Sequence, residues 1–449
     1  MDNSSTVAPH PHKERVNGKE KRNRLPRHRA ELWDQMQFFF QKYNDHQLHC
    51  AIFFEGQLEV ECLKKAVLLT IDMIPVLKSR FVEARVRPYW ERIHTGNEEV
   101  VTFVDSCCLE EEVNSFLTGK TEEFKGPQLK ARIIRSLSKD TLCIVMNHMI
   151  CDGAGFKEYL YLLSSLYTGF RRDPDYMPQY ETKGDRSLGQ IFKQIHLADK
   201  LKLLLLPNHM AKHNSGFFFP LSGEEDLSPS ILTYKLTSSR FHIIREYGKK
   251  HHATINDIVL AAYLRALYKV LDIKSTESIA IPCMIDLRRF LPDRKAGAVC
   301  NLTSTIICDI GPELGDSFDE TLMKVKCDMD RKKSNLPGLN GLFTLDAAFK
   351  LLPYSRVRKV MEKIFVNPSI AMTNIGAIDK NKLSFDNLQI EDAFITGSIK
   401  YPPYFQLALT SFNDSITFSI NLYGSESDKQ KIKSFFTLLD HELPDQVCL

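Results

Sequence analysis

The chain has 449 residues, of which 43% are hydrophobic and 26% are charged, and its formal net charge is +3. These proportions are typical of a globular protein, and the length favours two domains or subdomains over a single core. The small net charge gives no reason to expect nucleic acid or a membrane surface as a partner. No apolar stretch approaches the ~18 residues of a membrane-spanning helix.

The first 25 residues are polar and basic and show no periodicity, so we expect a disordered tail. They lack the apolar region of a secretory signal, and the eleven cysteines have no metal-type spacing. Reduced thiols and a cytoplasmic location are therefore expected. The histidine pairs His209/His213 and His251/His252 lack a third acidic or sulfur ligand at convincing spacing, so no metal site is predicted.

Residues 26–180 alternate strand and helix patterns and are predicted to form an N-terminal subdomain. A strand is expected at 48–55 and a helix at 60–74. Two further strands, 131–136 and 141–146, are expected to form a hairpin around residues 138–140.

The segment after this hairpin carries the most informative pattern, because His148 lies at the end of the apolar run 141–146 and before a glycine-flanked turn. Helical spacing resumes at 156–166. A histidine held there can project into a cleft and accept a proton from an attacking hydroxyl or amine. Asp152, four residues later, is placed to shape the turn or to pair with a cation. The alternative is structural: a histidine at a strand end is often only a packing residue, and Asp-Gly is often an ordinary turn.

Residues 181–230 are predicted to be a crossover segment with a leucine-rich helix that ends at Pro207, and residues 231–449 a C-terminal subdomain. Thr254 can cap a helix over 256–271. The remaining expected elements of this half are strands at 232–236, 278–285 and 303–310, helices at 241–251 and 316–334, and a hairpin of 405–412 with 415–422. Mixed strands and helices favour two α/β or α+β subdomains.

The pattern from His148 to Gly153 resembles the HxxxDG signature of the chloramphenicol acetyltransferase-like acyltransferases, which include condensation domains of peptide synthetases and alcohol acetyltransferases. Condensation domains usually have two successive histidines, whereas this chain has Asn147 at the first position. Further segments resemble family motifs in the expected order over roughly residues 25–440: 75–81, 253–262, Asp286-Leu287-Arg288, 297–301 and Thr373-Asn374-Ile375-Gly376.

The resemblance implies two subdomains in a V-shaped pseudo-dimer, with His148 as the general base in a tunnel at their interface. It also implies that Asp152 points away from the substrate and pairs with Arg288. Arg289 is adjacent to Arg288 and could take its place in this pair. Gly153 is expected to shape the turn. Residues expected to contact substrate are Asn147, Gly155, Ser304 and Asn374. Cys151 is expected to be a small turn residue rather than a nucleophile.

The predicted function is transfer of an acyl group from acyl-coenzyme A, or from a phosphopantetheine-linked thioester on an acyl or peptidyl carrier protein, to a small alcohol or amine. No permanently bound cofactor is expected. The alternatives are a stand-alone condensation enzyme that joins carrier-bound amino acids, and a non-catalytic carrier-binding module of the same fold. An intact His148 argues against the non-catalytic alternative.

Overall fold

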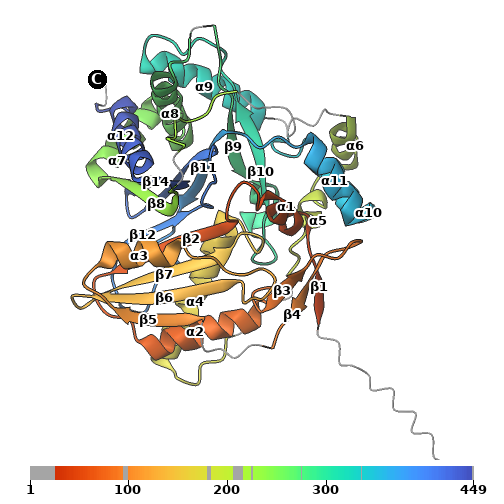
Figure 1. Cartoon of the computed structure of the whole chain (residues 1–449), viewed down its shortest axis with the longest axis vertical. Coiled ribbons are helices and arrows are strands. Elements are labelled where there is room, and N and C mark those ends of the chain that lie inside the picture. Colours follow the sequence, from red (N-terminus) through yellow and green to blue (C-terminus); the bar gives the residue numbers. More distant parts are fainter. Residues whose placement is uncertain are drawn as a thin grey trace, which may run out of the picture.

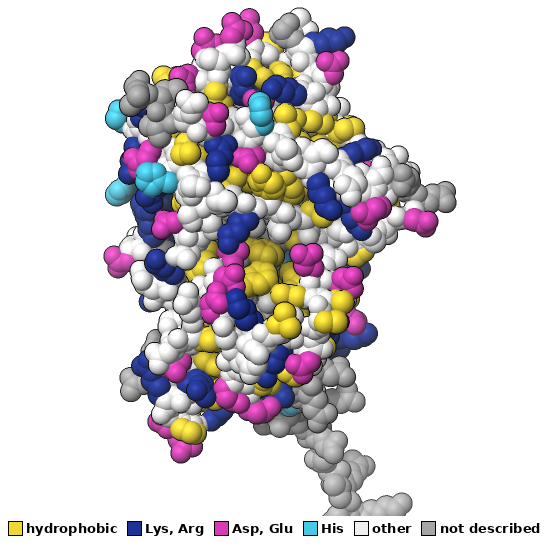
Figure 2. Space-filling model, turned by 90° about the vertical axis from the view of Figure 1, so that its left-hand side faces the viewer, with side chains coloured by type: hydrophobic (Ala, Val, Ile, Leu, Met, Phe, Trp, Pro, Cys, Tyr) yellow, Lys and Arg dark blue, Asp and Glu magenta, His cyan; other side chains and the backbone are white. Residues whose placement is uncertain are grey.

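The computed structural model describes residues 26–94, 100–178, 184–205, 216–223, 226–274, 276–334 and 336–446. The predicted tail, residues 1–25, lies outside this part of the chain. Figure 1 shows two α/β bodies, one above the other, with the short helix α1 (Leu32–Phe40) near their junction. On the face drawn in Figure 2, charges of both signs are interspersed, and hydrophobic side chains gather about halfway between its two ends.

The N-terminal sheet confirms the strands expected in the first half. Adjacent residues of its central strand face opposite sides, so Ile144 and Met146 pack in one apolar cluster while Cys143 and Val145 pack in another. Helices α2 (Val60–Met73) and α4 (Gly153–Arg172) cover the first side, and α3 (Leu109–Leu117) covers the second. The strand order is β12 (Ile390–Thr396), β2 (Gln47–Phe54), β7 (Lys139–Asn147), β6 (Leu129–Ser136) and β5 (Val101–Asp105).

The C-terminal sheet is covered by α7 (Ser238–Lys250), α8 (Ile255–Leu271), α9 (Phe318–Lys333) and α12 (Glu426–Glu442), which share its apolar cluster. Thr254 caps α8 as predicted, since its hydroxyl accepts from the Asp257 amide while the Asp257 carboxylate accepts in return. The strand order is β10 (Thr303–Cys308), β9 (Ile281–Asp286), β11 (Ile370–Ala377), β13 (Phe405–Phe412), β14 (Ser415–Gly424) and β8 (Ser228–Leu236).

A third apolar cluster joins α1 to elements of the second half, so α1 is packed from both sides. Among the described residues, no helix is both long and apolar enough to cross a membrane. The elements in or near this junction are α5 (Gly189–Phe192), α6 (Leu197–Leu205), α10 (Leu342–Leu351), α11 (Tyr354–Ile364), η2 (Leu287–Phe290), η3 (Pro292–Arg294) and a small sheet of β1 (Arg27–Arg29), β4 (Tyr89–Arg92) and β3 (Ser79–Val82).

The two bodies do not divide cleanly in the sequence, because β12 belongs to the N-terminal sheet. It pairs antiparallel with β2, with Ala393 opposite Ile52. The hydroxyl of Thr396 at its end hydrogen-bonds to that of Ser419 on β14, at 2.6 Å. A strand from the 231–449 region therefore completes the sheet of the 26–180 region. Such pairing depends on contacts between distant residues, which a local sequence pattern does not encode.

Candidate active site

His148 is the first residue after β7 and lies where the two bodies meet. Its amide donates to the carbonyl of His46, at 2.8 Å, which fixes the strand end against the segment before β2. Its own carbonyl accepts from Nδ2 of Asn301, at 2.9 Å, and Asn301 belongs to the second half. His148 thus contacts segments from both halves of the chain.

A cavity opens beside His148, and its walls come from both bodies. Strands β9, β10 and β11 supply one wall through residues such as Met284, Thr305 and Thr373, while α1 supplies Trp33 and Phe40. A space of about 210 Å³ is large enough for a substrate rather than for a single buried water. The structure thus provides the shared cavity that the sequence predicted.

The imidazole of His148 is neutral at pH 7. Burial lowers its pKa from the ordinary 6.5 to about 4, since the charged form loses its hydration. The nearby backbone of His148 itself and the charge of Asp152 oppose this shift, whereas the charge of Lys400 adds to it. Nδ1 is enclosed by protein atoms. Nε2 is consequently the nitrogen with which the ring can accept a proton from a molecule in the cavity.

Asp152 joins the turn after His148 to the second half. One carboxylate oxygen accepts from the Gly155 amide at 2.7 Å and so caps α4. The other accepts from Nη1 of Arg288 at 2.9 Å and from the Leu302 amide at 2.7 Å. These bonds and the adjacent cation keep the carboxylate ionised, although burial opposes this. The structure therefore forms the predicted Asp152–Arg288 pair, while Arg289 is exposed.

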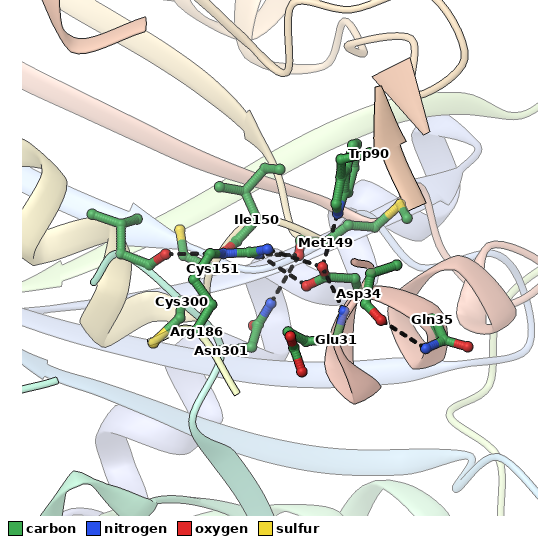
Figure 3. Close-up of polar contacts among 12 residues, drawn as sticks. Glu31, Asp34, Gln35, Trp90, Met149, Ile150, Cys151, Arg186, Cys300 and Asn301 are labelled. Atoms are coloured by element: carbon green, nitrogen blue, oxygen red, sulfur yellow. Dashed lines mark hydrogen bonds and ion pairs between the residues drawn. The ribbon is translucent and has the colours of Figure 1, made fainter. Parts of the chain in front are cut away.

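A second ion pair holds the same loop from the other side, and no sequence pattern predicted it. Figure 3 shows the Arg186 guanidinium between the Asp34 carboxylate and the backbone after His148. Both terminal nitrogens of Arg186 bond Asp34, at 3.0 and 2.9 Å, and one also reaches the Ile150 carbonyl at 2.9 Å. Nε1 of Trp90 donates to Asp34 at 2.8 Å. Neither partner lies in a recognisable motif, so no sequence signal pointed to this pair.

The two glycines of the signature have different surroundings. Gly153 lines the cavity, and a Cβ there would lie 2.9 Å from the Ile375 side chain. A Cβ on Gly155 would lie 2.6 Å from the carbonyl oxygen of Cys300. Gly155 thus permits α4 to approach the 299–301 segment and does not line the cavity, in contrast to its expected contact with substrate.

Three more residues expected to contact substrate have side chains outside the cavity lining. Ser304 and Asn374 alternate with lining residues on their strands, because neighbouring side chains of a strand point to opposite faces. The Ser304 hydroxyl donates to the Gly338 carbonyl, and Asn374 contacts Asn256 on α8. The side-chain amide of Asn147 donates to Oε1 of Gln128 at 2.8 Å, and its Oδ1 accepts from the Met149 amide at 2.9 Å. Asn147 therefore stabilises the turn.

The site also bears on two other kinds of chemistry, a cysteine nucleophile and a bound metal ion. Cys151 is fully buried, and burial raises the pKa of its thiol well above the ordinary value, which disfavours a thiolate nucleophile. Within the described ranges, no group of three or more His, Cys, Asp or Glu side chains is arranged to hold a metal ion. His209 and His213 lie outside those ranges.

Comparison with known proteins now defines the class of fold. Trichothecene 15-O-acetyltransferase from Fusarium sporotrichioides superposes with a TM-score of 0.67 at 13% identity, over 94% of this chain and 96% of that one. The first condensation domain of the CDA synthetase gives 0.66 at 13% identity, over 94% and 97%. Polyketide synthase associated protein 5 from Mycobacterium tuberculosis gives 0.62 at 15% identity, over 92% and 98%. The chain has the two-subdomain fold of condensation domains and chloramphenicol acetyltransferase-like enzymes, as predicted.

At the level of sequence, the profile of the WS/DGAT C-terminal domain matches residues 299–437. A search of curated protein sequences finds no significant match. The matched region includes Asn301, which bonds the His148 carbonyl, and all of β12. It therefore covers parts of the second half that build the cavity and its junction.

Proposed function

We propose that this protein is an acyltransferase that moves an acyl group from a thioester to an alcohol or amine, with His148 as the general base. The observation that carries the proposal is a neutral imidazole at a cavity whose walls come from both bodies. The likeness of the fold to an O-acetyltransferase and to condensation domains supports it, as does the WS/DGAT match. The donor is acyl-coenzyme A or a carrier-bound acyl thioester.

The reaction would proceed by direct attack in a ternary complex. The acceptor O–H or N–H bond breaks as its proton moves to Nε2 of His148, and the new bond to the thioester carbonyl carbon forms. The tetrahedral intermediate then collapses, the C–S bond breaks, and the leaving thiolate takes the proton back from the imidazolium. No covalent acyl-enzyme is needed, which agrees with the buried, protonated Cys151.

The two ion pairs would position the base rather than react. Asp152 and Arg288 fix the turn after His148 to the second half, and Arg186 binds the carbonyl of Ile150. A base held rigidly by its own backbone loses little orientational freedom when the acceptor binds. Base catalysis of this kind contributes about 10²–10⁴-fold, and positioning of the two substrates would contribute the remainder.

The test is mass spectrometry of the full-length protein incubated with a panel of acyl-coenzyme A donors and small alcohols and amines. Wild type should release acylated acceptor and free thiol in equal amounts, and His148→Ala should not. A stable acyl group on the protein would contradict direct transfer. Binding of donors without product across the panel would favour the non-catalytic module.

A condensation activity is the second candidate, because condensation domains superpose over nearly the whole chain. It would use the same base on a carrier-bound amine. Repeating the assay with aminoacyl groups on isolated carrier proteins separates the two: turnover with carrier-bound substrates and none with coenzyme A thioesters would favour condensation.

A further inference from the structure

Lys400 is a charged residue in the cavity that the proposed reaction does not use. It lies after β12 and lines the same cavity as His148. Its amide donates to the Asn421 carbonyl at 3.0 Å, and its carbonyl accepts from the Tyr423 amide at 2.9 Å. A bridge also pairs it with Asn44. The backbone is fixed on several sides, so the side chain leaves it in a defined direction.

The ammonium group of Lys400 has no hydrogen bond or ion pair with any residue that the structure describes. Asp45 exerts an attraction on it. Oδ1 of that carboxylate accepts from the amides of Ile399 and Gln47, at 2.9 and 3.2 Å, and Oδ2 lies 3.7 Å from Nε2 of His49. Burial lowers the pKa of Lys400 to about 8, so the group is still mostly charged at pH 7. A partly buried cation without a hydrogen-bonded partner loses part of its hydration, and an anion in the cavity would restore favourable contacts.

No other described residue of the cavity lining supplies an anion that pairs with Lys400. Among the described residues around the cavity, Lys400 is the one Lys or Arg, and Asp152 is the one carboxylate. Asp152 is already bonded to Arg288. Ser398, beside Lys400, donates its hydroxyl to the Gln47 carbonyl at 2.9 Å. Lys400 is therefore the one positive charge of the described cavity lining, and its attraction to Asp45 acts without a hydrogen bond or ion pair.

We propose that Lys400 binds a carboxylate on the substrate inside the cavity, so that the acyl group or the acceptor is an acidic molecule rather than a neutral one. This inference names the substrate class for the proposed acyl transfer and rests on it for the reaction. The binding of a carboxylate itself does not depend on turnover.

Recognition of an anion would also act on the base. The positive charge of Lys400 is one cause of the low pKa of His148, after burial. A bound carboxylate would neutralise that charge and raise the basicity of the imidazole while the substrate is present. The acidic substrate would thus help to prepare the base that deprotonates the acceptor.

Binding is tested with hexanoate and hexanamide, which have similar shapes and differ in charge. Trp33 lines the cavity and reports binding by fluorescence, and the buried Trp90 is the other tryptophan in the chain. A Trp33→Phe variant should remove the signal and so confirm its origin. Wild type should bind hexanoate at least ~10-fold more tightly at pH 7, about 1.4 kcal/mol.

The matched variants are Lys400→Met, Lys400→Arg and, as a control, Lys433→Met, which changes an exposed lysine on α12. Lys400→Met should abolish the preference for hexanoate, Lys400→Arg should retain part of it, and the control should retain all of it. A melting curve for each variant checks folding. Equal binding of the two probes by wild type overturns the proposal without any variant, and so does a preference that survives in folded Lys400→Met.

A turnover experiment tells which substrate carries the carboxylate. Glutaryl- and pentanoyl-coenzyme A form the donor pair, and β-alanine and β-alaninamide form the acceptor pair. A preference for the acidic member of either pair that Lys400→Met removes supports the proposal and identifies that substrate. An equal fall in kcat for acidic and neutral members would instead place Lys400 at the oxyanion and overturn it. If no transfer occurs, the proposed function fails, and the binding experiment alone decides the role of Lys400.

Discussion

The loop after β7 is held at two places by different ion pairs. At the far end, Asp152 pairs with Arg288, which lies in η2, directly after β9 in the second body. In its middle, Arg186 from the crossover segment donates to the Ile150 carbonyl and pairs with Asp34 on α1. The first pair lies within a recognisable sequence pattern, and the second does not. The position of His148 therefore depends on residues outside the motif in which it lies.

The pairs also differ in how they are buried. The Arg288 side chain is 5% exposed, and its Nε is enclosed without a hydrogen-bond partner among the described residues. The Arg186 side chain is 13% exposed, and its Nε contacts the Val299 carbonyl at 3.4 Å. Of the two guanidinium groups, Arg186 would therefore be better hydrated without its carboxylate. Removal of the carboxylate should thus cost more at the first pair than at the second.

The largest effect is expected for Asp152→Asn and Arg288→Ala. Each leaves a buried charge without its partner, so each should lower the free energy of unfolding by about 3–5 kcal/mol. Activity should fall as well. Denaturant titration measures the loss, and changing both residues should cost less than the sum of the single changes. Strictly additive losses would show that the contact contributes no coupling energy.

His148→Ala should act on activity without a matching loss of stability. Turnover should fall by at least ~10²-fold, because the positioned base is gone. The melting temperature should change little, since both ion pairs that hold the loop remain. The test is to measure the turnover of wild type and His148→Ala with the donor and acceptor identified in the panel assay. A rate within a few-fold of wild type would remove His148 as the base.

Arg186→Met should have a smaller effect on stability than Arg288→Ala, about 1.5–3 kcal/mol. Asp34 keeps the bonds from Trp90 and from the Glu31 amide on Oδ2, and methionine retains the packing of the arginine stem, which alanine at position 288 removes. Exposed Lys433→Met serves as a control with no expected loss. A loss as large as that of Arg288→Ala would mean that the two ion pairs are equivalent.

The two ion pairs should also be energetically coupled through the 299–301 segment. Arg288 donates to the Cys300 carbonyl at 2.8 Å, and Arg186 reaches the neighbouring Val299 carbonyl. A double-mutant cycle of Arg186→Met with Arg288→Ala should give an interaction energy of about 0.5–1 kcal/mol. Additivity within experimental error would show that each ion pair acts alone.

The smallest effect is expected for pH. The pKa of His148 is lowered from 6.5 to about 4, so the base stays neutral as the pH falls through the usual range of histidine. The kcat/KM value should change less than about two-fold between pH 7 and pH 5.5 and fall only as the pH approaches 4. A decline centred near 6.5 in the pH profile of kcat/KM would contradict the burial of the free base.

Local patterns in the sequence predicted much of the secondary structure. The hairpin of β13 and β14 turns at Asn413 and Asp414, which both adopt positive φ, as short polar residues do in such turns. The earlier hairpin turns at Leu137 and Ser138 instead, one residue before the predicted position. A leucine at positive φ is disfavoured locally, so the paired strands decide the position of that turn.

The sequence by itself determined many of the elements and the signature around His148, and its resemblance to the acyltransferase motifs indicated the partner of Asp152. Each of these depends on residue type and spacing, either through backbone preferences or through an ordered set of motifs. Only the tertiary structure decided that β12 joins the first sheet, that Ser304 and Asn374 face away from the cavity, and that Arg186 and Lys400 surround the base. The reason is that side-chain direction and charge pairing between distant segments follow from strand register and packing, which no single segment encodes.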